Sequence, residues 1–216
     1  MDALPATIQS FAFGNIVVKL CVPLTQTLRN NLPRSANAAA PAPFPYWARL
    51  WPAARALSQF IATNIHLIAD KNVLELAAGL GLPGLLAAHY ARKVILSDYV
   101  PESVVMMQAS VAINDSTNVT CRQLDWYQLP PHLNADVLLL SDINYDPAAF
   151  EILFKMLLEF LNKGTTIILS TPQRLMAGPF VARLLPFSIR QEEIEIVSEE
   201  RTFVTLLVLR KPLGDM

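Results

Sequence analysis

From Asn72 onward, short apolar runs alternate with longer amphipathic runs almost to the end of the chain. Short runs rich in β-branched residues predict buried strands, and apolar residues spaced three or four apart predict helices. The expected strands are residues 73–77, 93–97, 119–123, 135–141 and 165–171. The expected helices are residues 82–90, 101–114, 147–161 and 173–184. This alternation predicts a parallel sheet with right-handed crossovers and helices on both faces.

The two ends of the chain break the alternation. Residues 189–197 and 202–210 are β-rich and have no helix between them, which predicts an antiparallel strand at one edge of the sheet. Residues 7–13 and 16–22 are also β-rich and meet at Gly14-Asn15, which predicts an N-terminal hairpin. The expected fold is therefore α/β: a Rossmann-like, seven-stranded sheet with an antiparallel edge strand, plus an N-terminal β-hairpin.

Residues 30–45 form the nearest approach to a linker, because four prolines interrupt an alanine-rich stretch. A helix is expected directly after it, at residues 52–65, with Pro52 at the tolerated first turn. We therefore divide the chain into residues 1–45, a hairpin and proline-rich loop packed on the main domain, and residues 46–216, the main domain.

The composition fits one soluble core and excludes several classes of protein. The chain has 216 residues, of which 53% are hydrophobic and 16% charged, and its formal net charge is −1. That balance lacks the basic footprint of nucleic-acid binding. Neither a signal peptide nor an apolar stretch of membrane-spanning length is visible. Two distant cysteines and three scattered histidines suggest free thiols, no metal site and a cytoplasmic location; they are Cys21, Cys121, His66, His89 and His132.

A glycine-rich turn between a strand and a helix is the clearest candidate binding site. Gly79, Gly81 and Gly84 fit the pattern G-x-G-x-x-G and account for three of the seven glycines in the chain. Glycine allows a sharp turn and a close backbone approach to a ligand. The helix that follows is expected to present free N–H groups to a carboxylate or phosphate.

Two acidic residues around this turn narrow the choice of cofactor. Asp98 ends the second strand, where a carboxylate can accept hydrogen bonds from ribose hydroxyls; capping the following helix is the alternative. Both a dinucleotide and S-adenosylmethionine fit these features. Glu75, four residues before Gly79, favours S-adenosylmethionine, because a carboxylate repels a pyrophosphate and attracts a sulfonium and an ammonium.

The segment Val73-Leu74-Glu75-Leu76, with the glycines and Asp98, resembles the opening of seven-strand S-adenosylmethionine-dependent methyltransferases. Two further segments resemble family 16 of these enzymes, the protein lysine methyltransferases that include the electron-transfer-flavoprotein β-subunit enzyme. They are Pro45-Tyr46-Trp47-Ala48-Arg49-Leu50-Trp51-Pro52 and Ser141-Asp142-Ile143-Asn144-Tyr145, the second of which is similar to the family's D-x-x-Y motif. Ala77 departs from the family, which usually has glycine there.

The resemblance implies roles for ten residues. It implies that the methionine side of S-adenosyl-L-methionine is lined by Glu75, Gly79 and Gly81. The ribose is assigned to Asp98, and the adenine to Asp125 and Trp126. Two further cofactor contacts are implied, Trp51 beside the cofactor and Ser141 at the methyl-transfer channel. Ordinary core packing is the alternative for Trp51 and Trp126. The implied catalytic residues are Asp142 and Tyr145.

The acceptor implied by the resemblance is a protein lysine, which Asp142 would orient as an amine. The alternative for Asp142 is a helix cap, a role that Asp146 before Pro147 fits better. Other acceptors remain open, since a fold does not determine the substrate. A small-molecule N- or O-methyltransferase, or a non-catalytic binding module, would have the same fold. An oxidoreductase is a more distant alternative, and the oligomeric state is left open.

Overall fold

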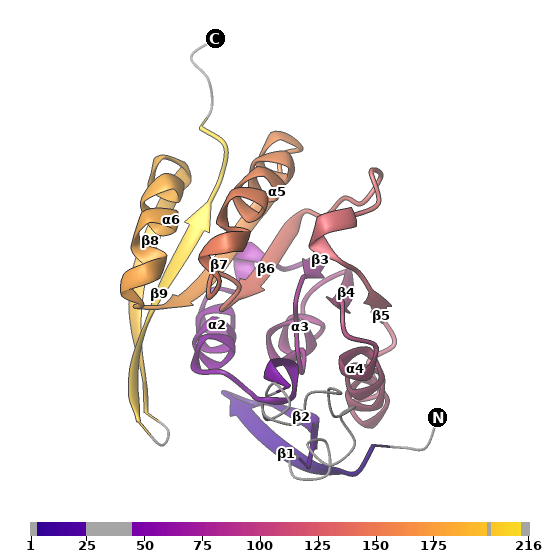
Figure 1. Cartoon of the computed structure of the whole chain (residues 1–216). Helices are drawn as coiled ribbons and strands as arrows, with labels where there is room; N and C mark the ends of the chain where they lie inside the picture. The colour runs from indigo at the N-terminus through magenta and orange to yellow at the C-terminus, as the bar shows by residue number, and fades with distance from the viewer. Residues whose placement is uncertain (1–3, 25–44, 198–199, 213–216) are drawn as a thin grey trace, which may run out of the picture.

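The computed structural model describes residues 4–24, 45–197 and 200–212, and within them the predicted α/β architecture is confirmed (Figure 1). Seven strands form one sheet in the order β5-β4-β3-β6-β7-β9-β8. They are β3 (Asn72–Glu75), β4 (Lys93–Asp98), β5 (Val119–Gln123), β6 (Val137–Ser141), β7 (Thr166–Pro172), β8 (Ser188–Val197) and β9 (Arg201–Leu209). The strands from β5 to β7 are parallel, while β9 is antiparallel to both of its neighbours.

The antiparallel strand lies one place inside the edge at which the sequence predicts it. β9 pairs with β7 and β8, so β8 is the outermost strand. The reason is that β8 and β9 join the sheet as one hairpin, with the second strand inward. The outer strand carries four charged residues, Arg190, Glu192, Glu193 and Glu195. Charged side chains at an edge discourage pairing with another chain.

The strand order reverses between β3 and β6. From β3 the chain continues outward through β4 and β5, and from β6 it continues to the other side of the sheet. Ligands of open parallel sheets bind at such a reversal, beyond the carboxyl ends of the strands. Because Glu75 ends β3 and Ser141 ends β6, the residues that follow them enter this crevice.

The helices cover both faces of the sheet. α2 (Pro52–Thr63), α3 (Leu82–Ala87) and α4 (Pro101–Ile113) lie on one face, and α5 (Phe150–Asn162) and α6 (Gly178–Leu184) on the other (Figure 1). Short 3-10 turns occupy Tyr46–Ala48 (η1), Ile65–Leu67 (η2), Trp126–Gln128 (η3), Pro147–Ala149 (η4), Leu175–Ala177 (η5) and Leu185–Phe187 (η6). Across the described segments, no helix combines the length and apolarity needed to cross a bilayer.

The expected helix at residues 173–184 is shorter than predicted. A 3-10 turn replaces its first residues, and α6 begins only at Gly178. Proline lacks an N–H group and is tolerated only in the first turn of a helix, so Pro179 favours a start directly before it. Residues 173–177, which lie outside the α-helix, therefore follow β7 beside the crevice.

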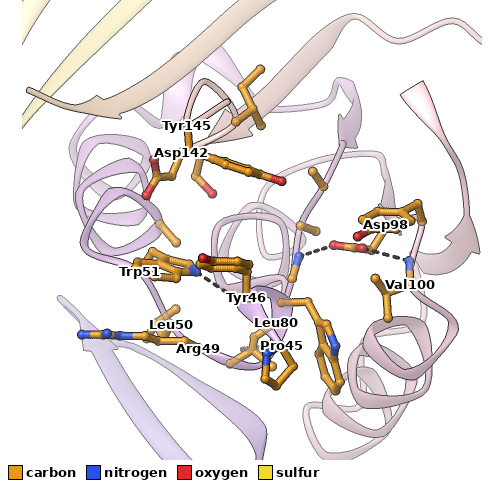
Figure 2. A pocket seen from close by; sticks show the side chains of 18 of the residues that line it. Pro45, Tyr46, Arg49, Leu50, Trp51, Leu80, Asp98, Val100, Asp142 and Tyr145 are labelled. Atoms are coloured by element: carbon orange, nitrogen blue, oxygen red, sulfur yellow. Dashed lines mark hydrogen bonds between the residues drawn. The ribbon is translucent and has the colours of Figure 1, made fainter. Parts of the chain in front are cut away.

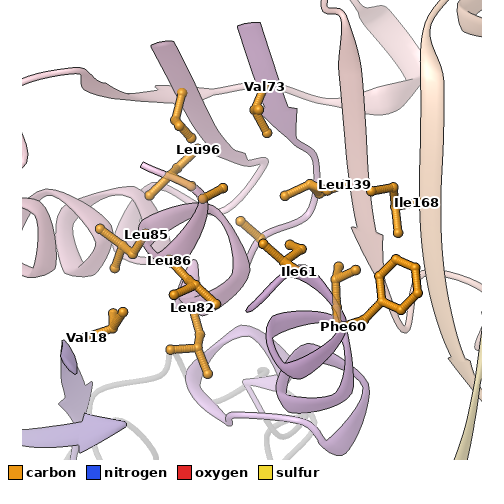
Figure 3. Close-up of a cluster of buried hydrophobic side chains, with 14 of the residues drawn as sticks. Val18, Phe60, Ile61, Val73, Leu82, Leu85, Leu86, Leu96, Leu139 and Ile168 are labelled. Carbon is orange, nitrogen blue, oxygen red and sulfur yellow. The ribbon is translucent and has the colours of Figure 1, made fainter. Parts of the chain in front are cut away.

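Neighbouring residues of the central strand point to opposite faces. In β3, Val73 belongs to the apolar cluster under α2, α3 and α4, whereas Leu74 belongs to the cluster under α5 and α6. Figure 3 shows the first cluster, in which Phe60 of α2 packs beside Ile168 of β7. Both faces of β3 are buried because the strand lies in the interior of the sheet. The loop that follows β3 therefore lies over the middle of the sheet.

The N-terminal hairpin is confirmed and is part of the core. β1 (Ala6–Phe13) and β2 (Ile16–Pro23) pair antiparallel, with Phe13 opposite Ile16 across a two-residue turn. Val18 and Leu20 of β2 are fully buried in the cluster under α3 and α4. The loop predicted at residues 30–45 lies, apart from its last residue, outside the described part of the chain, and the domain boundary after residue 45 stays a prediction.

Gly84 in α3 provides a test of this packing. A Cβ at Gly84 would lie 2.2 Å from Leu96 Cδ2 and 2.6 Å from Glu75 Oε2. We therefore expect Gly84→Ala to lower the free energy of unfolding by about 1–3 kcal/mol, as overpacking of a dense core does. Urea unfolding measures the change.

The matched control is Gly178→Ala in α6, where an added Cβ would meet nothing within 4 Å. Its effect should stay within about 0.5 kcal/mol. Equal stabilities of the two variants would contradict the close packing of α3 on β3 and β4.

Candidate functional site

A cavity of about 690 Å³ opens at the carboxyl ends of β3, β4 and β6. Its walls come mainly from residues 45–51, 77–80, 98–102 and 141–145. Ligand pockets in proteins commonly enclose about 300–1,000 Å³. The cavity brings together seven of the ten predicted site residues, Trp51, Gly79, Asp98, Trp126, Ser141, Asp142 and Tyr145.

The glycine loop has three left-handed backbone positions, and two of them, Ala77 and Gly79, line the cavity. Ala77, Gly79 and Gly81 have φ values of 51°, 55° and 75°. At Gly79 a Cβ would lie 3.1 Å from the carbonyl oxygen of Trp47, so glycine also permits the approach of that segment. The left-handed φ at Ala77 is the conformation for which glycine is suited. An alanine adopts it at a cost of roughly 1–2 kcal/mol, which explains why Ala77 stands out in the sequence.

Asp98 holds the glycine loop and also faces the cavity. Its Oδ2 accepts a hydrogen bond from the Gly79 N–H at 2.9 Å, and its Oδ1 accepts one from the Val100 N–H at 3.0 Å (Figure 2). Burial raises the pKa of Asp98, and hydrogen bonds from Val100, Gly79, Tyr99 and Ser103 oppose that rise. Asp98 does not cap α4, whose N-cap is Val100 and receives no side-chain cap. Ribose binding by Asp98 stays a prediction.

Glu75 and Gly81 do not line the cavity, although the sequence predicts them beside the methionine. Glu75 is fully buried under the loop, and its Oε2 accepts a hydrogen bond from the Gly84 N–H at 2.8 Å. Within the described part of the chain, its other oxygen has no hydrogen-bond partner. This corrects the expectation that the helix after the loop offers free N–H groups to a ligand, because the protein's own carboxylate takes the Gly84 amide. Burial raises the pKa of Glu75 to about 8.

Trp126 lies between the main cavity and a smaller one of about 250 Å³. Asp125 lines only the smaller cavity, and its Oδ1 accepts a hydrogen bond from the Tyr127 N–H at 2.9 Å. The indole Nε1 of Trp126 is buried and has no hydrogen-bond partner among the described residues. A buried donor without a partner is uncommon in proteins.

Asp142 shares its carboxylate with Arg174, a residue that the sequence did not single out. Two guanidinium nitrogens of Arg174 donate to the two oxygens of Asp142, with Nη2 lying 2.9 Å from Oδ2. The side chain of Asp142 is 7% exposed and that of Arg174 is 32% exposed. Burial raises the pKa of Asp142, and the Arg174 guanidinium opposes that rise. The available signal was position, because Arg174 follows a predicted strand that ends at the same sheet edge.

Three aromatic rings that line the cavity, those of Trp51, Tyr46 and Tyr145, form a stack. The Tyr46 ring lies 6.0 Å from the Trp51 ring and 6.0 Å from the Tyr145 ring, centroid to centroid, and both pairs are nearly parallel. The Trp51 Nε1–H donates to the Tyr46 carbonyl at 2.9 Å, which fixes the first pair. Figure 2 shows this stack on the same side of the cavity as Asp142, with Asp98 on the other side. Tyr46, missed as a site residue, sits in the tryptophan-rich segment that signalled the family.

The structure also bears on the predicted cap at Asp146, on the two cysteines and on metal binding. The Asp146 Oδ1 accepts a hydrogen bond from the Ala148 N–H, so Asp146 caps η4 as predicted. Cys21 and Cys121 both carry free thiols. In the described segments, no cluster of three or more His, Cys, Asp or Glu side chains could hold a metal ion.

A model of the family described as "Lysine methyltransferase" matches residues 47–183. Histone-arginine methyltransferase METTL23 of Xenopus laevis is 35% identical over 132 residues, covering 58% of this chain and 54% of that protein. Protein-lysine N-methyltransferase EFM3 of Chaetomium thermophilum is 34% identical over 142 residues, covering 58% and 42%. This chain thus spans about half the length of these curated relatives.

Among solved structures, the precorrin-6y C5,15-methyltransferase of Geobacter metallireducens superposes with a TM-score of 0.58. The match has 10% sequence identity and covers 73% of this chain and 87% of that one. At this identity the likeness concerns the fold alone.

The buried carboxyl of Glu75 predicts a pH dependence of stability. The folded pKa of about 8 exceeds the ordinary value of 4.5. Between these values the unfolded chain has lost the proton and the folded protein retains it. The contribution of Glu75 is therefore complete at low pH, and it decreases by up to about 1.4 kcal/mol per pH unit as the pH rises toward 8. Glu75→Gln, which cannot ionise, should lack this decrease in urea unfolding at about pH 5.5 and about pH 7.5.

Glu159→Gln on the exposed face of α5 is the control, since it removes a carboxyl without touching the loop. It should follow the wild-type profile. If Glu75→Gln also followed that profile, the raised pKa of Glu75 would be excluded.

Proposed function

We propose a function from one premise: the chain belongs to the lysine methyltransferase family whose model matches residues 47–183. The proposed activity is S-adenosylmethionine-dependent methylation of a protein lysine. The observation that carries it is the convergence of Gly79, Asp98 and Asp142 on one cavity. A cytoplasmic location and a protein partner belong to the same proposal.

The residues that line the cavity fit S-adenosylmethionine. Asp98 lines it at the end of β4, a position at which a carboxylate can accept hydrogen bonds from ribose hydroxyls. The indole of Trp126 lines the same cavity and offers an apolar face to a purine. Gly79 allows the loop to turn sharply at the cavity wall.

The same loop disfavours a dinucleotide. A pyrophosphate binds dinucleotide folds at the N–H groups of the helix after the glycine turn. Here the Gly84 N–H already binds the Glu75 carboxyl, so it is not available to a pyrophosphate.

In the proposed reaction, S-adenosylmethionine supplies an electrophilic methyl group bound to a sulfonium sulfur. Asp142 would accept the proton that a lysine ammonium must lose, because only the free amine has the lone pair that attacks. Burial raises the pKa of Asp142 and thereby makes it a better proton acceptor. The stack of Trp51, Tyr46 and Tyr145 would exclude water and hold the alkyl chain of the lysine.

An arginine acceptor is the second candidate. It is favoured by the name of a relative at 35% identity, a histone-arginine methyltransferase. It is also favoured by the guanidinium of Arg174, since Asp142 binds that group inside the cavity. The acceptor experiment separates this candidate from the first.

The proposed transfer predicts a labelled protein. Incubating the chain with methyl-labelled S-adenosylmethionine and a cell lysate should label a protein band, with methyl mass shifts on lysine. Asp142→Ala should reduce turnover by at least about a hundredfold, as loss of a general base does. Its affinity for S-adenosylmethionine, measured by calorimetry, should be nearly unchanged, because Asp142 lies across the cavity from Asp98 (Figure 2).

The other outcomes of this experiment are decisive. Mass shifts on arginine would support the second candidate, and label found only in small molecules would replace the protein acceptor. No label, with cofactor binding intact, would indicate a binding module. Binding of a nicotinamide dinucleotide without S-adenosylmethionine would overturn the proposal, and equal losses of binding and turnover in Asp142→Ala would remove its assigned role.

Cofactor binding itself should depend on Asp98. Asp98→Ala should weaken S-adenosylmethionine binding roughly ten- to a hundredfold, because hydrogen bonds to a charged group contribute about 1.5–3 kcal/mol. Calorimetric titration measures the change. Asp136→Ala is the matched control, since Asp136 also accepts a backbone hydrogen bond, from Asn72, but at the amino ends of the strands. Similar affinities of the two variants would remove Asp98 from the cofactor site.

A further inference from the structure

The Asp142 carboxylate is a cation site that the protein occupies with its own side chain. Both of its oxygens accept hydrogen bonds from the Arg174 guanidinium, and both residues line the cavity. A planar guanidinium that donates twice to one carboxylate is the strongest of the common ion-pair geometries. The site therefore binds a positive group before any acceptor arrives.

In this pair the aspartate is the fixed partner and the arginine the movable one. Asp142 has a left-handed φ of 55°, and its N–H donates to the Ser170 carbonyl at 2.9 Å. Its carboxylate is thus directed into the cavity by the backbone itself. The Arg174 side chain is 32% exposed. Arg174 is also the N-cap residue of η5, a 3-10 turn in which Leu175 is fully exposed and Met176 about half exposed. Solvent on one side gives the guanidinium space to rotate outward.

We propose that Arg174 is a resident cation that a positively charged acceptor side chain displaces from Asp142. The inference rests on the proposed function and makes it more specific. Removing one partner of a buried pair leaves an uncompensated charge, which is strongly unfavourable. A group that brings its own positive charge restores the pair, whereas a neutral or anionic side chain does not. Arg174 is thus a specificity determinant: it admits lysine or arginine and rejects uncharged acceptors.

The aromatic stack supports the same exchange. Tyr145 lines the cavity with Asp142 and Arg174, and its ring is stacked on that of Tyr46 (Figure 2). Aromatic faces attract cations, so an entering ammonium would meet a favourable surface before it reaches the carboxylate. The cavity therefore presents an aromatic surface to a cation in addition to the Asp142 carboxylate.

The test uses n-butylammonium as a probe for a lysine side chain and n-butanol as its neutral counterpart. Arg174→Gln should bind n-butylammonium about tenfold more tightly than wild type, because the competing internal cation is gone. The same variant should bind n-butanol as wild type does. Adding Asp142→Asn to it should remove the gain. Titrations followed by two-dimensional NMR measure all five affinities: those of wild type and Arg174→Gln for both probes, and that of the double variant for n-butylammonium.

Arg183→Gln is the matched control, because Arg183 of α6 pairs with Glu151 on the surface, away from the cavity. It should leave the affinity for n-butylammonium unchanged. If Arg174→Gln bound the probe no better than wild type, or less well, Arg174 would be a positioning residue for Asp142 and the proposal would be overturned.

A measurement on the wild type keeps the test independent of how the variant folds. Saturating n-butylammonium should shift the Arg174 Nε–H signal to that of a solvent-exposed arginine, and an unchanged signal would also overturn displacement. Calorimetry with S-adenosylmethionine on the same samples separates the two hypotheses. If the wild type did not bind S-adenosylmethionine, that result would count against the proposed function alone. Binding of n-butylammonium reports on Arg174 independently of the cofactor.

Discussion

The buried carboxyl of Glu75 is the contact on which the arrangement of the cavity depends. Its Oε2 accepts from the Gly84 N–H, so the start of α3 is held against the end of β3. The same contact excludes a side chain at Gly84. The Glu75 carbonyl accepts from the Ser97 hydroxyl at 2.8 Å, and Ser97 directly precedes Asp98. One residue thus sets the glycine loop, the helix behind it and the neighbouring strand end in register. Its second oxygen is buried without a hydrogen-bond partner among the described residues, which carries an energetic cost.

The two ends of the cavity are built differently, and the difference matches the two tasks proposed for them. Asp98 is held by backbone N–H groups, which cannot leave without unfolding the loop. Asp142 is held by the side chain of Arg174, which is partly exposed and can be replaced. A carboxylate whose partners are backbone groups suits a cofactor that binds in the same way at every turnover. A carboxylate whose partner is a movable side chain suits an acceptor that arrives on another protein and must leave after transfer.

The sequence was informative where chemistry is local and uninformative where it depends on meetings between distant residues. Strand periodicity, the glycine loop and the strand-end position of Asp98 are local signals, and the fold that they predict is confirmed. The pairing of Asp142 with Arg174 joins residues 32 positions apart, and no motif marks the arginine. The direction of Glu75 was equally hidden, because a carboxyl at a strand end can face either the ligand or the helix. Tertiary packing decided this, turning Glu75 beneath the loop rather than toward the cavity.

The charge state of the acceptor distinguishes lysine from arginine in this cavity. A lysine ammonium has an ordinary pKa near 10.4, and desolvation lowers it. Burial raises the pKa of Asp142, so Asp142 accepts a proton more readily from an ammonium that is desolvated beside it. A guanidinium retains its proton under the same conditions, because arginine is not deprotonated in proteins. The electrostatics of the cavity therefore favour lysine, with Arg174 showing what Asp142 can bind rather than what it can deprotonate.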